Sequence, residues 1–347
     1  MTGLTEYRSM LEERGARFGE DGRPLDFGDP AGELAAIEAA EPVIIPLDHR
    51  SLLTATGTEV LPFFQGQFTN DVNSARNGQP VLAAHLTPKG RVLATLLLFP
   101  LEDGYAVDFP GDTAESLTRR LRMFVLRSDV HLEEAGGHWI RLGLAGPGSE
   151  TAAAAAAGSD RPGDERVTRG SRGTVVPLPG PGPAFMVLVP TGEGPAAWRE
   201  ATRHARPVGD PAWTLGRIRA GVPDLGAAHA EQFLPQEANL EPLGAISYTK
   251  GCYTGQEVVA RTKHLGRLKR RLYRVAAGAE LHPGQAVQAT EGDQAQGRIV
   301  SAAPAPGGGW EALAVLRIET VEAGTPLFPE GQPESALEVL ALPYSPE

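Results

Sequence analysis

Cysteine is almost absent from this chain, because Cys252 is the only one among 347 residues. A single cysteine excludes a disulfide within the chain and any metal site built from several cysteines of one chain. It is compatible with a reducing compartment, and we expect the protein to be cytoplasmic. Lysine is also scarce, since it occurs only at positions 89, 250, 263 and 269. Two rare residue types therefore occur together at positions 250–252.

Long apolar runs are missing as well. No stretch of about 18 uncharged apolar residues occurs, so we expect no membrane-spanning helix and no membrane partner. The first residues, Met1–Glu13, are polar and lack the apolar segment of a signal peptide. The net charge is −11 and the pI is about 5.3, so the chain as a whole should repel nucleic acid, and direct nucleic-acid binding is not expected.

The composition suits a soluble globular protein, with 41% hydrophobic and 22% charged residues. The length allows two or three hydrophobic cores. Strand and helix patterns alternate up to residue 210 and include an apolar hairpin at 83–86 and 92–99. Ala152–Ala157 predicts a short helix, and the charged segment Ser159–Gly173 predicts a mobile loop. Short strands beyond residue 270 predict a small antiparallel barrel or sandwich, so the fold class is α+β.

The stretch Lys250–Glu257 combines both rare residue types with two glycines. Thr254 and Glu257 fit a capping box, which predicts a helix beginning at Thr254. Cys252 would then precede a helix N-terminus, where the helix dipole and Lys250 favour a thiolate. Gly251 and Gly255 allow backbone conformations that are costly for other residues. A packed and inert cysteine is the alternative interpretation.

Two other segments carry polar residues in suggestive places. In Gln65–Val72, amides and an Asn-Asp pair follow an apolar run; the simplest interpretation is a helix that ends in a turn, with Asn70 and Asp71 binding local backbone. Thr87–Arg91 reads as the turn of the apolar hairpin. Trp213–Pro223 lies upstream of the cysteine motif and includes Arg217 and Arg219.

The octapeptide Lys-Gly-Cys-Tyr-Thr-Gly-Gln-Glu, continued by Val-Val-Ala and Arg261, resembles the signature of the folate-binding YgfZ family. Members of that family are related to the T-protein of the glycine cleavage system, a tetrahydrofolate-dependent aminomethyltransferase. Gln65–Val72, Thr87–Arg91 and Trp213–Arg261 are similar to the matching segments of the family. The resemblance implies a T-protein-like arrangement of two ferredoxin-like α+β units and a C-terminal antiparallel β-barrel around a central folate cavity.

The resemblance also implies a domain division and two sets of site residues. The expected parts are an extension at 1–42, a discontinuous folate-binding domain at 43–145 with 210–262, a second α+β domain with a mobile loop at 146–209, and a barrel at 263–347. The functional motif comprises Lys250, Gly251, Cys252, Tyr253, Thr254, Gly255, Gln256, Glu257 and Arg261. The folate-binding residues, for tetrahydrofolate or a derivative, comprise Gln67, Thr69, Asn70, Asp71, Lys89, Arg127 and Arg217.

Two departures from the T-protein argue against aminomethyl transfer. The position of its catalytic aspartate falls near Ala94, and the position of its pterin-binding glutamate is Arg219, so both carboxylates are missing. The expected function is therefore folate binding in support of the assembly, repair or maintenance of iron–sulfur proteins, with an indirect effect on tRNA modification. Its partners would be a reduced folate and iron–sulfur client or assembly proteins. Cys252 would be a reactive thiol or a transient iron ligand, with no stable metal site.

Two alternatives remain at this stage, namely a tetrahydrofolate-dependent one-carbon transferase and a non-catalytic interaction module. The basic segment 250–274 also has several interpretations. Glu257 is its only acid, whereas Lys or Arg occurs at 250, 261, 263, 267, 269, 270, 271 and 274. The segment is either a charged strand edge, an anion site for the glutamate tail of folate, or a docking patch for RNA or an acidic protein.

Overall fold

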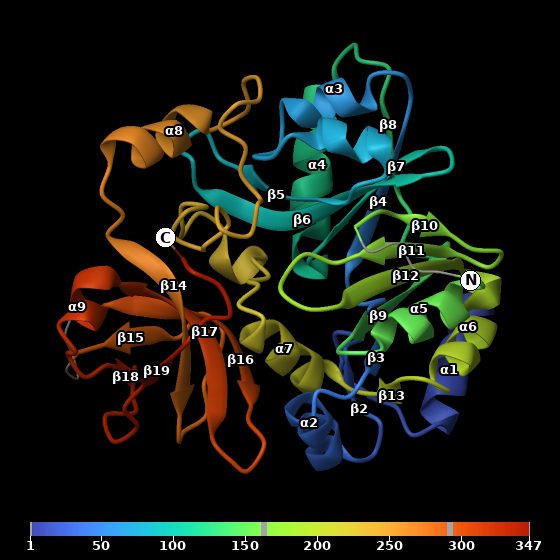
Figure 1. Ribbon diagram of the computed structural model, residues 1–347. Coiled ribbons are helices and arrows are strands. Elements are labelled where there is room, and N and C mark those ends of the chain that lie inside the picture. Colours follow the sequence, from blue (N-terminus) through green and yellow to red (C-terminus); the bar gives the residue numbers. More distant parts are fainter. Residues whose placement is uncertain (1, 161–164, 290–293, 347) are drawn as a thin grey trace.

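The computed structural model describes residues 2–160, 165–289 and 294–346 and shows a mixed α+β protein built on three large sheets (Figure 1). Helix α7 (Asp210–Arg219) lies between the C-terminal sheet and the other two sheets, and packs on β16 and on α2 (Pro30–Glu38). The predicted α+β class is thus confirmed. None of the described helices combines the length and the apolar character needed to cross a membrane.

The first sheet is a five-stranded antiparallel sheet that contains the predicted hairpin. Its order is β5 (Val81–Leu86), β6 (Val92–Leu101), β7 (Gly104–Phe109), β4 (Ser51–Thr56) and β8 (His131–Glu134). Most of β6 is buried, as its continuous apolar run predicts. One face packs on helices α3 (Val60–Gln65) and α4 (Ala114–Val125) and on the 3₁₀ helix η1 (Val72–Asn77), around Phe64, Leu98 and Leu121.

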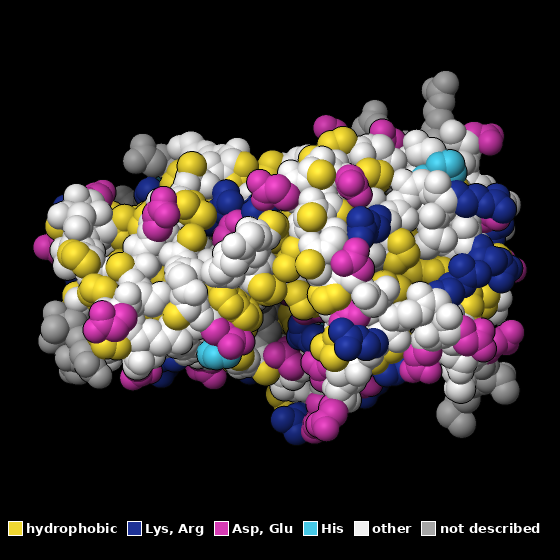
Figure 2. Space-filling view, turned by 90° about the horizontal axis from the view of Figure 1, so that it is seen from below, with side chains coloured by type: hydrophobic (Ala, Val, Ile, Leu, Met, Phe, Trp, Pro, Cys, Tyr) yellow, Lys and Arg dark blue, Asp and Glu magenta, His cyan; other side chains and the backbone are white. Residues whose placement is uncertain are grey.

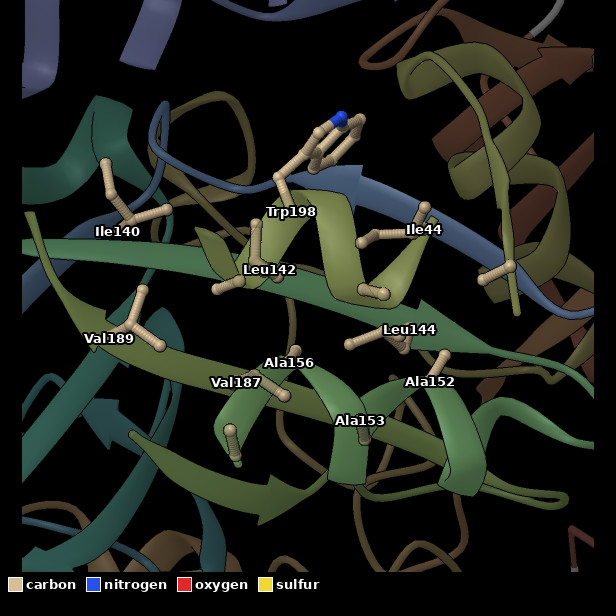
Figure 3. Packing of buried hydrophobic residues seen from close by; sticks show 14 of the residues in the cluster. Ile44, Ile140, Leu142, Leu144, Ala152, Ala153, Ala156, Val187, Val189 and Trp198 are labelled. Atoms are coloured by element: carbon tan, nitrogen blue, oxygen red, sulfur yellow. The ribbon is translucent and has the colours of Figure 1, made fainter. Parts of the chain in front are cut away.

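The second sheet has six strands. Its order is β10 (Thr168–Arg169), β11 (Thr174–Pro177), β12 (Ala184–Pro190), β9 (Trp139–Ala145), β3 (Val43–Pro46) and β13 (Arg206–Pro207). Figure 3 shows its apolar side chains packed against α5 (Ser149–Ala157) and against Trp198 of α6 (Gly194–Ala201). The alanines let α5 lie close to the strands, and Gly158 ends the helix in the left-handed conformation.

The N-terminal segment is packed rather than free. Helix α1 (Thr2–Glu13) buries Tyr7 and Leu11, each 1% exposed, in the same core as Trp198. A small sheet of β1 (Arg17–Phe18) and β2 (Pro24–Asp26) follows α1. The predicted division into domains stays a prediction. The second sheet nonetheless crosses this division, because β9 pairs with β12 and β3 pairs with β13, and β12 and β13 both lie in the 146–209 segment.

The third sheet is C-terminal and antiparallel and curls into a half-barrel, in agreement with the small antiparallel barrel or sandwich that the sequence predicted. Its order is β18 (Phe328–Pro329), β15 (Ala286–Gln288), β16 (Gly297–Pro304), β17 (Trp310–Arg317), β14 (Arg270–Ala277) and β19 (Glu338–Leu340). A short helix, α9 (Ile318–Glu322), follows β17. The remaining 3₁₀ turns are η2 (Gly111–Thr113), η3 (Thr191–Glu193) and η4 (Ala227–His229).

The start of one helix differs from the prediction, and the predicted mobile loop is described only in part. The helix expected at Thr254 begins instead at Gln256, as α8 (Gln256–Leu265), and its N-cap is Gly255 without a side-chain hydrogen bond. The capping box therefore does not form. The expected mobile loop Ser159–Gly173 includes residues 161–164, which lie outside the described residues; its last part contains β10, paired with β11.

Candidate functional site

The side chain of Lys250 joins the cysteine loop to the segment that contains the Asn-Asp pair. Its Nζ donates to the carbonyl oxygens of Phe68 at 2.7 Å and Asn70 at 2.8 Å, and lies 5.0 Å from the ring centre of Tyr253. Burial lowers the pKa of Lys250 to about 8, although the nearby Asp71 favours the charged form. Both hydrogen bonds of this ammonium thus go to backbone, so Lys250 fixes the turn rather than serving the thiol of Cys252.

Thr69 and Asn70 are also used to hold backbone together. The buried hydroxyl of Thr69 donates to the Ala245 carbonyl at 2.7 Å and accepts from the Ala84 amide at 2.9 Å. The Asn70 amide donates to the carbonyls of Leu82 at 2.8 Å and Gly244 at 2.7 Å. These bonds attach the loop before Lys250 to strand β5. Asn70 therefore binds backbone mainly of distant segments, and only its Oδ1, which accepts from the Asp71 amide, makes the local bond that the turn interpretation predicts.

Asp71 has a local role of the same kind. It is the N-cap of η1 and accepts from the Asn73 amide at 3.1 Å and from the Gln65 side chain at 3.0 Å. The pKa of Asp71 is lowered, first by the hydrogen bond from the Asn73 backbone and least by Lys250. Its carboxylate is exposed, so one side remains open to solvent.

Two glycines bring the hairpin turn Thr87–Arg91 against the cysteine loop. Gly255 has φ +84°, and a Cβ there would lie 2.6 Å from the Thr87 carbonyl oxygen and 3.0 Å from the Cα of Gly90. A Cβ on Gly90 would in turn lie 2.8 Å from the Cβ of Val258. The close approach that Gly255 allows is thus an approach of this chain to itself.

The rest of the motif divides into a buried and an exposed part. Tyr253 is 7% exposed and belongs to the core formed by the hairpin, α7 and the C-terminal sheet. The exposed residues are Gly251, Cys252, Glu257 and Arg261. The Thr254 amide donates to the Gly66 carbonyl at 3.4 Å, and Gln256 begins α8. Cys252 is therefore exposed to solvent, on a loop whose residues Lys250 and Tyr253 are buried.

A cavity of about 320 Å³ lies where the three sheets and α7 meet. Its walls come from β6 and β7, from the end of β3, from β12, from β16 and from the segment 222–229. Among the residues predicted to bind folate, Arg217 lines this cavity, whereas Gln67, Thr69, Asn70, Asp71, Lys89 and Arg127 do not. No residue from Lys250 to Arg261 lines it either. The cysteine loop and the cavity are therefore separate sites.

The other predicted residues lie in three places. Asn70 borders a shallower recess of about 300 Å³ that shares Leu82 and Pro179 with the cavity. Lys89 is exposed in the hairpin turn, and Arg127 is exposed just after α4. Gln67 is half-buried, and its Oε1 has no hydrogen-bond partner among the described residues.

An ion-pair cluster, in which Asp108 is buried and Asp224 is exposed, forms one wall of the cavity. The Arg50 guanidinium donates to Asp108 Oδ2 at 2.7 Å and to Asp224 Oδ2 at 2.6 Å. Burial works to lower the pKa of Arg50, but the two aspartates outweigh it and raise the pKa. Burial works to raise the pKa of Asp224, but Arg50 and Arg217 outweigh it and lower the pKa. Arg50 and Asp224 are therefore charged at neutral pH.

Several polar groups of the cavity lack partners among the described residues. The Asp108 Oδ1 atom is buried without a hydrogen bond, and the Arg217 guanidinium has neither a hydrogen bond nor an ion pair to a described residue. Burial, then Arg50, lowers the pKa of Arg217, while Asp224 opposes them. An unpaired buried polar group costs about 1–3 kcal/mol, so such groups in a cavity indicate that a polar ligand or water completes them.

Two neutral histidines add to the unpaired groups. Burial, followed by Arg50 and Arg23, lowers the pKa of His49 to about 3; its Nε2 lies 3.8 Å from Asp210, and its Nδ1 has no partner. Burial also lowers the pKa of His229. Neither ring nitrogen of His229 has a hydrogen-bond partner among the described residues. The cavity thus offers both donors and acceptors. Within the described residues, no group of three His, Cys, Asp or Glu side chains is placed to hold a metal ion.

The sequence did not single out His49, Arg50, Asp108 and Asp224, because they lie on three separate segments. The only available signal was the polar trio Asp48-His49-Arg50 directly after an apolar strand. The structure also shows the surroundings of Ala94 and Arg219, the two positions expected to replace the T-protein carboxylates. Ala94 is buried in the core of the first sheet, and Arg219 pairs with Glu311 and Glu38, each at 2.7 Å, outside the cavity lining.

Comparison with known proteins gives a consistent result. No family model matches the chain. It is 32% identical to the tRNA-modifying protein YgfZ of Yersinia pestis (strain Pestoides F) over 240 residues, which is 69% of this chain and 72% of the relative. The same values hold for the protein of that name from Yersinia pestis bv. Antiqua (strain Angola). The fold is similar to the crystal structure of glycine cleavage system aminomethyltransferase T from Bartonella henselae, with a TM-score of 0.77, 18% identity, and 97% and 96% of the two chains covered.

Proposed function

This chain belongs to the YgfZ family, and from that premise we propose that its central cavity binds a reduced folate. The proposal rests on two groups of the cavity, the half-buried Arg217 guanidinium and the buried Asp108 Oδ1, which have no hydrogen-bond partner among the described residues. Tetrahydrofolate has amino and N–H donors on its pterin ring and carboxylates on its glutamate. Asp108 would accept from the pterin, and Arg217 would pair with an anionic or carbonyl oxygen. The fold similarity to an aminomethyltransferase supports the choice of ligand.

Bound folate is proposed to act without aminomethyl transfer. In a transferase, a carboxylate near the reacting nitrogen assists the transfer of protons and of the one-carbon unit. The positions that would supply it are Ala94 and Arg219, and Arg219 is fully engaged by Glu38 and Glu311. Asp108 and Asp224 both pair with Arg50, which lowers the pKa of Asp224, and such pairing suits binding better than proton transfer. A tetrahydrofolate-dependent one-carbon transferase remains the second candidate, since both aspartates line the cavity.

The cysteine loop is proposed as the place where the protein acts on iron–sulfur proteins in the cytoplasm. Cys252 is exposed on a rigid loop, which suits a thiol that contacts a client or assembly protein. As one thiolate it would bind iron only transiently, because stable clusters take four ligands. Its effect on tRNA modification would be indirect, through such clients. A pure interaction module, in which Cys252 has no chemistry, is the third candidate.

Calorimetry with tetrahydrofolate tests the proposal. We expect binding that Arg217→Gln weakens at least tenfold, because a charge-assisted bond contributes about 1.5–3 kcal/mol. Arg127→Gln serves as the matched control, because Arg127 was predicted to contact folate but is exposed outside the cavity. Equal weakening by both variants, or no binding up to millimolar ligand, refutes the cavity as a folate site. Turnover of methylene-tetrahydrofolate would favour the transferase instead.

A further inference from the structure

A second and larger cavity, of about 1010 Å³, lies at one end of the C-terminal sheet. Its walls come from the hairpin turn at Arg91, the 232–237 segment, the connection from α8 to β14, the start of β16, the end of β17 and α9. We call it the basic pocket, after its six cationic residues Arg91, Arg267, Lys269, Arg270, Arg298 and Arg317. It shares no lining residue with the central cavity.

Only part of this positive charge is neutralised within the protein. Glu237 pairs with Arg270 at 2.9 Å and with Arg91 at 3.3 Å, and it also accepts from the Leu234 amide at 2.8 Å, so it is fully used. Arg298 donates to the Gly284 carbonyl. Three exposed cations, Arg267, Lys269 and Arg317, form no ion pair or side-chain hydrogen bond with any residue in the described ranges. The pocket thus keeps an unneutralised basic rim in a chain whose net charge is −11.

The sheet register places two of these cations directly opposite each other. Arg270 of β14 pairs in register with Arg317 of β17, and Arg271 is the next residue along β14. Like charges at opposite positions destabilise an antiparallel pair. Glu237 relieves Arg270, but no described acid relieves Arg317, and the other acids of the pocket, Glu319 and Glu322, are exposed on α9. An anion bound by the side chains of Arg270 and Arg317 would reduce this repulsion.

The basic pocket is also tied structurally to the cysteine loop. Arg91 follows Gly90, which packs against Gly255 and Val258, and α8 leads from that loop into Arg267. The hairpin turn and α8 thus each contribute to both places. A ligand in the basic pocket would lie on the elements that present Cys252. The view of the molecule in Figure 2, by contrast, shows a face on which acidic and basic side chains are interspersed.

We propose that the basic pocket binds the phosphate groups of an RNA strand. A volume of about 1010 Å³ and cations on separate segments suit several phosphates along a backbone better than one compact anion. Arginine predominates, and its planar fork matches phosphate oxygens. The proposal goes beyond the proposed function, in which the effect on tRNA is indirect, and it does not depend on folate binding. It also reverses the expectation from net charge that the protein binds no nucleic acid.

Fluorescence anisotropy of the full chain with a labelled single-stranded RNA of about 12 nucleotides tests the proposal. We expect the triple variant Arg267→Glu, Lys269→Glu, Arg317→Glu to lower affinity at least tenfold. The matched control, Arg76→Glu, Arg166→Glu, Arg199→Glu, reverses three exposed arginines that lie outside the basic pocket and form no ion pair with any described residue, and it should lower affinity less than about threefold. The logarithm of affinity should fall with the logarithm of salt with a slope of about −2, as expected for three phosphate contacts on a single strand.

Several results would overturn the proposal. Equal losses in the two variants, no RNA binding by the wild type, or a slope near zero would each do so. Displacement of the RNA by equal concentrations of tripolyphosphate would assign the pocket to free polyphosphates, and displacement by polyglutamate would assign it to carboxylates. If the triple variant fails to fold, Lys269→Gln with Arg317→Gln replaces it and should lower affinity about threefold. Tetrahydrofolate titration of the same variants, expected to match the wild type, separates this test from that of the proposed function.

Discussion

The cysteine loop and the central cavity use their polar groups in opposite ways. Around Lys250, most polar groups have partners in the chain, since Lys250, Thr69 and Asn70 all bind backbone. In the cavity, Asp108 Oδ1, His49 Nδ1 and the Arg217 guanidinium have none among the described residues. Satisfied polar groups fix a shape, whereas unsatisfied ones in a cavity invite a ligand. The motif that is most evident in the sequence therefore serves mainly as a scaffold, apart from its exposed thiol.

The largest expected effect comes from the cavity, and it separates the roles of Arg50 and Arg217. Arg50→Ala leaves the buried Asp108 without its cation, whereas Asp224 keeps contact with solvent, so we expect a loss of about 3 kcal/mol in the free energy of unfolding. Arg217→Ala removes an arginine with no partner, so the loss should stay below about 1 kcal/mol. Urea unfolding of both variants measures the difference. Equal losses would mean that Arg217 is a structural residue and not a free ligand-binding group.

The second prediction concerns the scaffold, and compares its two glycines. In Gly255→Ala, the new Cβ would lie 2.6 Å from the Thr87 carbonyl oxygen at φ +84°, so we expect a loss of about 2–4 kcal/mol. Gly251→Ala is the control, because a Cβ there has no other atom within 4 Å and the change should cost less than about 1 kcal/mol. Thermal melts followed by circular dichroism compare the two. A strong loss at Gly251 and none at Gly255 would contradict the packing of the hairpin turn against this loop.

The contrast between these regions also explains what the sequence could predict. The hairpin at 83–99 and the alanine helix depend on local propensity and on apolar periodicity, and both are present in the structure. The start of α8 was misplaced because the predicted capping box depends on one short motif, while contact with the hairpin turn sets the backbone at Gly255. Arg50, Asp108 and Asp224 come from three distant segments, so no local pattern could reveal their cluster.

The third prediction uses the pH dependence of stability to test the burial of Lys250. Its pKa is about 8 in the folded protein and about 10.4 in an unfolded chain. Between these values the unfolded state binds more protons, so this residue makes stability increase as pH rises from 8 to 10.4. The increase should reach about 2–3 kcal/mol. Lys250→Met should lack it, so the stability of the wild type relative to this variant should increase over that range.

Urea unfolding at several pH values measures this relative stability. Lys263→Met is the control, because Lys263 is exposed and pairs with Glu241 at the surface. The free energy of unfolding of Lys263→Met should change with pH as that of the wild type does across this range. The difference in free energy of unfolding between the wild type and Lys250→Met could instead stay constant from pH 8 to 10.4. That result would show that the ammonium is solvated, and that its bonds to Phe68 and Asn70 do not hold the loop.

The smallest effect on stability is expected for Cys252→Ser, which tests the exposed part of the same loop. Because the thiol is exposed, the serine hydroxyl can hydrogen-bond to water, and the free energy of unfolding should change by less than about 0.5 kcal/mol. Biological activity should nevertheless be lost, because a serine hydroxyl stays protonated at neutral pH and is a poor ligand for iron and a poor nucleophile. The measurement is complementation of a strain that lacks the protein, read out by an iron–sulfur enzyme, together with a thermal melt.

A packed and inert cysteine would give the reverse, a lowered melting temperature with activity retained. Full complementation by the serine variant at unchanged stability would mean that the loop acts through its shape alone, and the interaction module would then be the better account of this protein.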